Sequence, residues 1–101
     1  MDRFALLGLF EAKPGKEQEL EAFLKSALPL AQQETKTISW YAVKLGANRF
    51  GIFDTFADEA GRDAHLNGEI AKALMAKAGE LLAVPPSIEK LDILAVKAPG
   101  K

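Results

Sequence analysis

Residues 37–60, TISWYAVKLGANRFGIFDTFADEA, carry the clearest local signals of secondary structure in the chain. Two segments rich in aromatic and β-branched residues, 37–45 and 49–57, flank the short polar sequence Gly-Ala-Asn at 46–48 and predict a β-hairpin. Asp58 follows the second strand directly and is a typical helix N-cap. This stretch therefore predicts two paired strands that lead straight into a helix.

A strand and a helix are expected before the hairpin. Apolar residues recur at helical spacing from Leu20 to Ala31, which is the stripe of an amphipathic helix. Pro29 lies inside this pattern and removes one backbone hydrogen bond. We expect a helix over residues 15–33 with an interruption near Pro29, preceded by a strand over Phe4–Ala12.

A helix and a strand are expected after the hairpin. The helix that Asp58 begins should break near Asn67-Gly68 and then resume, because a second apolar stripe runs from Ile70 to Leu81. The pair Pro85-Pro86 cannot continue a helix. The last strand is expected over Ile88–Val96.

The predicted order of elements is β-α-β-β-α-β, the ferredoxin-like arrangement of the α+β class. Right-handed crossovers would place both helices on one face of a four-stranded antiparallel sheet. The 101 residues suit a single domain over 1–101.

The strand pattern also predicts a partner for the sheet. Alternate residues of a strand point to opposite faces. In the first strand, Phe4 and Leu6 are apolar on one face, and Leu7 and Leu9 are apolar on the other. Two helices can cover only one face, so the other face would be a large apolar patch. We expect a homodimer through this sheet face, and the alternative is a monomer whose open face is partly apolar.

Composition excludes several classes of function. The net charge is −1 and basic residues do not gather on one segment, so we expect no nucleic acid partner. No apolar run approaches the roughly 20 residues of a membrane span, and no signal peptide is visible. Cysteine is absent, which fits a reducing compartment. We expect a cytoplasmic protein.

Two residues are candidates for chemistry. His65 is the only histidine, and it is either a boundary residue with one hydrogen bond or a proton shuttle at the mouth of a pocket. Asp54 stands in an otherwise apolar strand row with Phe50, Ile52 and Phe56. If buried, it must be paired or have a raised pKa. It either pairs with Arg62 or a lysine, or it orients His65 or accepts a substrate hydroxyl.

Other motifs give little support for a specific chemistry. Trp40 and Tyr41 occupy opposite faces of one strand, and the sequence leaves open which of them faces the helices. A metal site is not expected, because no second histidine exists and no carboxylate stands at ligand spacing from His65. No phosphate-binding glycine motif is present either.

Residues 50–60, FGIFDTFADEA, followed by His65-Leu66, resemble the antibiotic biosynthesis monooxygenase superfamily. Members of that family have an acidic-x-aromatic triplet at the end of the third strand, here Asp54-Thr55-Phe56, and then a helix that bears a histidine, here His65. The family's strand aromatic is usually Trp, and its first strand often carries an Asn that this chain lacks. The haem-degrading members therefore match least.

The resemblance implies a dimeric α+β barrel with a cavity between the sheet and the helices. It implies a quinol monooxygenase-like enzyme that oxygenates a small phenol or quinol without a cofactor. His65 and Asp54 would be the catalytic residues, and Trp40, Phe56 and Ile52 would bind the substrate. The alternative is a dimer that only binds a small apolar or aromatic metabolite.

Overall fold

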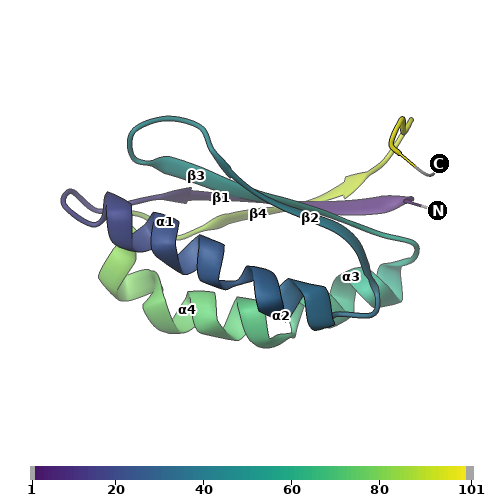
Figure 1. The fold of residues 1–101 in the computed structure, drawn as a ribbon, viewed down its shortest axis with the longest axis horizontal. Coiled ribbons are helices and arrows are strands. Elements are labelled where there is room, and N and C mark those ends of the chain that lie inside the picture. Colours follow the sequence, from purple (N-terminus) through teal and green to yellow (C-terminus); the bar gives the residue numbers. More distant parts are fainter. Residues whose placement is uncertain (1, 100–101) are drawn as a thin grey trace.

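The computed structural model describes residues 2–99, and its elements follow the predicted order, with each helical connection split into two segments (Figure 1). The elements are β1 (Phe4–Glu11), α1 (Glu17–Ser26), α2 (Leu28–Gln33), β2 (Thr37–Lys44), β3 (Arg49–Phe56), α3 (Glu59–Leu66), α4 (Glu69–Leu81) and β4 (Ser87–Asp92).

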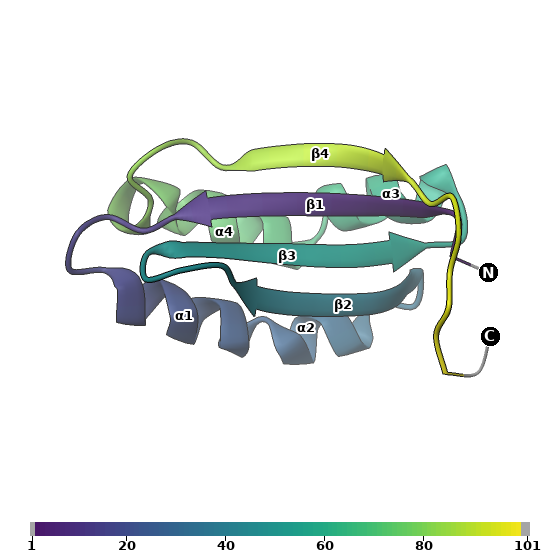
Figure 2. The same ribbon diagram turned by 90° about the horizontal axis from the view of Figure 1, so that it is seen from above.

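The four strands form one antiparallel sheet in the order β2-β3-β1-β4 (Figure 2). All four helical segments lie on the same face of this sheet, and the other face is open (Figure 1). The predicted α+β, ferredoxin-like fold is therefore confirmed, with β1 and β3 as the central strands.

The first helical connection is interrupted near Pro29, as predicted, and the break lies two residues before the proline. Helix α1 ends at Ser26, and the chain turns at Ala27, whose N–H donates to Leu24 O at 3.2 Å. Pro29 stands in the first turn of α2. A proline is tolerated there, because the first N–H groups of a helix have no partner inside the helix.

The second helical connection follows the prediction closely. The side chain of Asp58 accepts a hydrogen bond from the Gly61 N–H at 2.7 Å, which is an N-cap interaction. The helix breaks at Asn67-Gly68, as expected, and resumes as α4.

The last strand is shorter than predicted. We expected it over 88–96, but β4 ends at Asp92, and one further hydrogen bond joins Ile93 N to Arg3 O at 2.9 Å. Beyond this point β1 has no residues left to pair with, so the chain leaves the sheet. Residues 93–99 rise on the face away from the helices (Figure 1).

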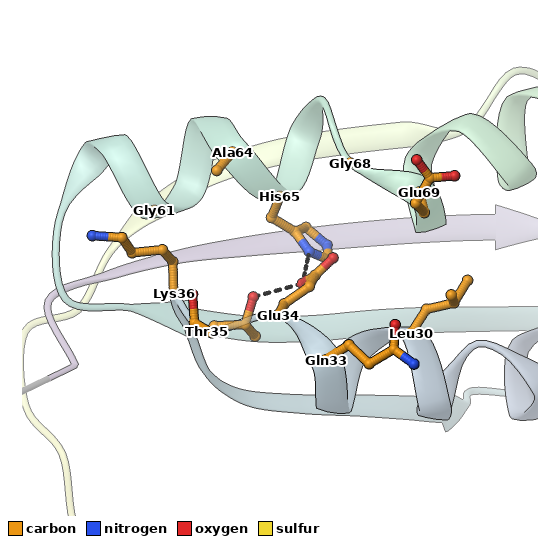
Figure 3. Close-up of a pocket in the computed structure, with 11 residues that line it drawn as sticks. Leu30, Gln33, Glu34, Thr35, Lys36, Gly61, Ala64, His65, Gly68 and Glu69 are labelled. Atoms are coloured by element: carbon orange, nitrogen blue, oxygen red, sulfur yellow. Dashed lines mark hydrogen bonds and ion pairs between the residues drawn. The ribbon is translucent and has the colours of Figure 1, made fainter.

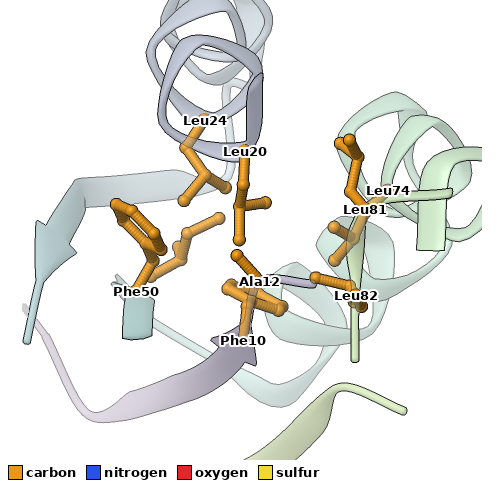
Figure 4. Close-up of a cluster of buried hydrophobic side chains, with 9 residues drawn as sticks. Phe10, Ala12, Leu20, Leu24, Phe50, Leu74, Leu81 and Leu82 are labelled. Atoms are coloured by element: carbon orange, nitrogen blue, oxygen red, sulfur yellow. The ribbon is translucent and has the colours of Figure 1, made fainter. Parts of the chain in front are cut away.

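The core lies between the sheet and helices α1 and α4 (Figure 4). Its main cluster joins both central strands to both long helices. The buried members are Phe10, Ala12, Leu20, Leu24, Phe50, Ile52, Leu74, Leu81 and Leu82. Burying one such leucine or phenylalanine contributes roughly 1.5–3 kcal/mol, so this cluster fixes the helices on the sheet.

The open face of the sheet carries apolar side chains, as the strand pattern predicts. On β2 and just beyond it, Tyr41, Val43 and Leu45 are 56%, 44% and 48% exposed. Partly buried Leu7, Leu9 and Phe53 continue this surface across β1 and β3. None of the helices in residues 2–99 combines the length and the apolar character that crossing a bilayer requires.

Candidate functional site

The site begins with a carboxylate in the middle of the sheet. Asp54 pairs with Leu6 on one side and with Trp40 on the other, and cross-strand partners share a face of the sheet. This row faces the helices, where Asp54 is only 1% exposed. Burial of an ionisable group among apolar neighbours is costly unless another polar group pairs with it.

His65 supplies that partner from the last turn of α3. Its Nε2 lies 2.8 Å from Oδ2 of Asp54, and its ring centroid lies 5.5 Å from that of Phe56. The N-cap at Asp58 fixes where α3 begins, and His65 lies seven residues further on, almost two full turns. The helix therefore presents the imidazole to the sheet.

A second carboxylate contacts the other ring nitrogen. Glu34 directly follows α2, and its Oε1 lies 2.7 Å from Nδ1 of His65 (Figure 3). The Thr37 hydroxyl donates to the same oxygen at 2.7 Å. The β2–β3 register shifts between Thr37 and Ser39, so Thr37 stands opposite Phe56 on the helix side. This β-bulge is what directs the Thr37 hydroxyl to Glu34.

The pKa values of both central groups lie above their ordinary values. Burial raises the pKa of Asp54, and the contact with His65 offsets only part of that rise. Burial alone would lower the pKa of His65, but its contacts with Asp54 and Glu34 outweigh this effect and raise it. A proton is therefore held more tightly at this pair than at either isolated side chain.

A small pocket lies on the Asp54 side of the ring, and we call it the inner pocket. It holds about 50 Å³ between the sheet and helices α3 and α4, and its lining includes Gly8, Ile52, Leu74 and Ile88 beside Asp54 and His65. Oδ1 of Asp54 is buried and has no hydrogen-bond partner among residues 2–99. Oδ2 also makes no hydrogen bond within this range, although it lies 2.8 Å from Nε2 of His65, so the apolar pocket is bordered by a carboxylate that can still accept hydrogen bonds.

A larger pocket lies on the Glu34 side, and we call it the outer pocket (Figure 3). It holds about 380 Å³ between the segment after α2 and helices α3 and α4, and its lining includes Glu34, Lys36, His65 and Glu69. His65 therefore separates two pockets, with Asp54 at one and Glu34 at the other.

The structure brings together most of the residues that the sequence singled out. Asp54 contacts His65 rather than Arg62, whose Nη1 donates to Leu91 O at 3.1 Å. Ile52 lines the inner pocket, and Phe56 is fully buried against the histidine ring.

Of the two adjacent aromatic residues of β2, Trp40 faces the helices. Trp40 packs against the core clusters, and Tyr41 lies on the open face. Trp40 lines a separate groove beside α2 and does not line the inner pocket. Its predicted role in binding substrate therefore has no support from the pocket lining.

Glu34 is the site residue that sequence reasoning missed. It follows a short helix in a polar stretch, Gln32 to Thr37, where a carboxylate is expected on the surface. Only its distance from His65, 31 residues along the chain, makes it part of the site. Residues 2–99 contain no cluster of three His, Asp or Glu side chains that could hold a metal ion.

Comparison with solved structures identifies the fold. A Mycobacterium tuberculosis protein matches at a TM-score of 0.84 and 20% identity, over 95% of this chain and 99% of that one. An antibiotic biosynthesis monooxygenase matches at a TM-score of 0.78 and 13% identity, over 91% of this chain and 99% of that one. No family model matches the sequence, and no curated protein does. The fold is that of the antibiotic biosynthesis monooxygenases.

A much nearer relative is a Nitrosomonas europaea protein of unknown function. Its crystal structure matches at a TM-score of 0.97 and 57% identity, over all of this chain and 98% of that one. The chain belongs to the family of this Nitrosomonas europaea protein.

Proposed function

We propose that the protein is a cofactor-independent monooxygenase that binds a small phenol or quinol with its hydroxyl at Asp54. The observation that carries this proposal is the buried, unpartnered Oδ1 of Asp54 in an apolar pocket beside His65. The carboxylate of the outer pocket, Glu34, is less available, because its Oε1 already accepts hydrogen bonds from Thr37 and His65. We place the activity in the cytoplasm, because a chain without cysteine suits a reducing compartment.

The proposed reaction balances without a further reductant. Asp54 takes the proton of the hydroxyl, and the electron-rich anion reduces dioxygen. One oxygen atom enters the ring and the other leaves as water, while the quinol becomes a hydroxylated quinone and supplies all four electrons. A carboxylate whose pKa is raised by burial is a stronger base than an ordinary one, which suits this step.

The test is oxygen uptake with reduced menadione and with anthrone. We expect Asp54→Asn to lower kcat about 100-fold or more, because a positioned base contributes on the order of 10²–10⁴ in rate. Asp63→Asn is the matched control, since it removes an exposed carboxylate from α3 outside both pockets. Equal rates of oxygen uptake for the wild type, Asp54→Asn and the uncatalysed reaction would rule out the proposed monooxygenase activity.

A non-catalytic binding module is the second candidate, and the largely apolar lining of the inner pocket supports it. About 50 Å³ is far below the 300–1,000 Å³ of typical ligand pockets, so a ring can enter only if the lining side chains move apart. A pure binding module predicts a higher melting temperature with menadione or 1-naphthol and no oxygen uptake with either quinol or anthrone.

We also propose that the protein is a homodimer through the open sheet face. The supporting observation is the apolar surface formed by Tyr41, Val43 and Leu45 with Leu7, Leu9 and Phe53, which no helix covers. A second copy packed about a two-fold axis would bury the same surface on both subunits.

A further inference from the structure

Both nitrogens of His65 face a carboxylate, but the two carboxylates differ in burial. Asp54 at Nε2 is 1% exposed, whereas Glu34 at Nδ1 is 20% exposed and borders the outer pocket. A carboxylate that keeps part of its hydration holds its charge at a lower cost than a fully buried one. Glu34 is therefore better placed to accept a permanent hydrogen bond from the ring.

The contact at one ring nitrogen decides the state of the other. In a neutral imidazole one nitrogen donates and the other accepts, and a hydrogen bond at Nδ1 selects which form is present. With Nδ1–H donated to Glu34, Nε2 carries no proton in the neutral ring, and it lies 2.8 Å from Oδ2 of Asp54. Asp54 can then pass a proton to Nε2 or take one back.

We infer that Glu34 is a positioning residue that keeps a proton on Nδ1 of His65, so that Nε2 is the atom that exchanges a proton with Asp54. This inference rests on the proposed function, since it names how the Asp54 site disposes of the hydroxyl proton. Glu34 itself touches no substrate in this scheme. Thr37 supports it by donating to the same carboxylate oxygen.

Other charged groups near the ring do not compete for this role. Lys36 and Glu69 line the outer pocket, but neither forms an ion pair with His65. Arg62, on the same helix, donates to the backbone of β4. The ring contacts Glu34, which directly follows α2, on one side and Asp54 of β3 on the other.

The experiment uses NMR on the only histidine in the chain, so a single set of ¹⁵N and Cε1–H signals reports on His65. In Glu34→Ala, Asp54 is the only acceptor left, so we expect the neutral ring to move its proton from Nδ1 to Nε2 and its pKa to fall. In Glu34→Gln, the side-chain oxygen can still accept a hydrogen bond from Nδ1, but the negative charge is gone. The Nδ1–H form should therefore persist while the pKa of His65 still falls.

Glu69→Ala is the matched control, because it removes a carboxylate from the same pocket without touching the ring. We expect it to change neither the tautomer nor the pKa of His65. Should Glu34→Ala fail to fold, Thr37→Val removes the hydroxyl that holds Glu34 and should give a smaller change in the same direction.

Kinetics complete the test. Glu34→Ala should lower kcat at least about tenfold with little change in KM, since the lost group acts through His65 and not on the substrate, and Glu34→Gln should lie between it and the wild type. An unchanged tautomer in Glu34→Ala, or a changed tautomer with unchanged kcat, would overturn the inference. If the wild type takes up no oxygen, the proposed function fails, and the tautomer alone decides the role of Glu34.

Discussion

At the scale of single residues, the Asp54–His65 pair couples proton binding to folding. A group that binds its proton more tightly in the folded than in the unfolded protein stabilises the fold at low pH, and this contribution is lost as the pH rises. For His65 the contribution is complete below its ordinary pKa of 6.5 and disappears as the pH passes the raised folded-state pKa. Asp54 contributes in the same way. Its stabilisation is complete below its ordinary pKa of 3.8 and is lost as the pH passes its raised folded-state pKa.

This coupling gives a prediction for His65→Gln. The wild type should lose free energy of unfolding relative to His65→Gln as the pH rises above 6.5, because the wild type releases the tightly held proton of His65 and the variant has no such proton. Urea unfolding followed by circular dichroism at several pH values measures the difference. Parallel curves for the two proteins would show that His65 binds its proton equally well in both states.

At the scale of elements, two local features position the site. The N-cap at Asp58 sets the start of α3 and hence the height of His65 above the sheet. Gly8 on β1 leaves room for the inner pocket, because an added Cβ would lie 2.8 Å from Cζ of Phe10. Each feature can be altered without changing Asp54, His65 or Glu34.

Asp58→Ala should destabilise the protein by about 1 kcal/mol, because the Gly61 N–H loses its acceptor. It should also loosen the packing of His65. The chemical shift of the imidazole signal in NMR spectra should then move toward the value of an unfolded chain. Asp63→Ala is the control on the same helix, since its exposed side chain makes no cap. Equal urea midpoints for the two variants would contradict a role for the cap.

Gly8→Ala should fill the inner pocket and push the Phe10 ring aside, at a cost of roughly 1–3 kcal/mol. Thermal stabilisation by menadione or 1-naphthol should disappear in this variant. Gly79→Ala is the comparison, because nothing lies within 4 Å of its added Cβ, and a helix gains up to about 1 kcal/mol from this change. Undiminished ligand binding by Gly8→Ala would place the ligand elsewhere.

At the scale of the whole molecule, the sheet has one covered and one open face. The helices bury Phe50, Ile52, Asp54 and Phe56 on one side of β3. On the other side the apolar surface around Tyr41 has no cover within residues 2–99. A partner on this face would leave both pockets accessible, because they lie on the helix side.

Tyr41→Asp should convert the proposed dimer to a monomer at micromolar concentration, because a charge buried in an apolar interface is costly. Met75→Asp, which places the same charge on an apolar residue of α4 that is 63% exposed on the helix side, should leave the dimer intact. Sedimentation velocity distinguishes the two. A wild type that sediments as a monomer would refute the dimer directly.

Much of the fold was predictable because its signals are local. The hairpin, the Asp58 cap and the break at Asn67-Gly68 each depend on a few neighbouring residues, and all three are confirmed. The break near Pro29 is confirmed within two residues, whereas the end of the last strand was misplaced. That end depends on where β1 runs out of pairing positions.

The amino-acid sequence alone was enough to predict the order of elements, the mostly apolar strand row that contains Asp54, and His65 as one candidate partner of Asp54 beside Arg62 and the lysines. These follow from strand alternation and from residue chemistry. Only the tertiary structure decided that Glu34 contacts the second nitrogen of His65, that a β-bulge turns Thr37 toward it, and that Trp40 lies outside the inner pocket. Contacts between residues 31 positions apart depend on helix placement and strand register, and no local pattern encodes either one.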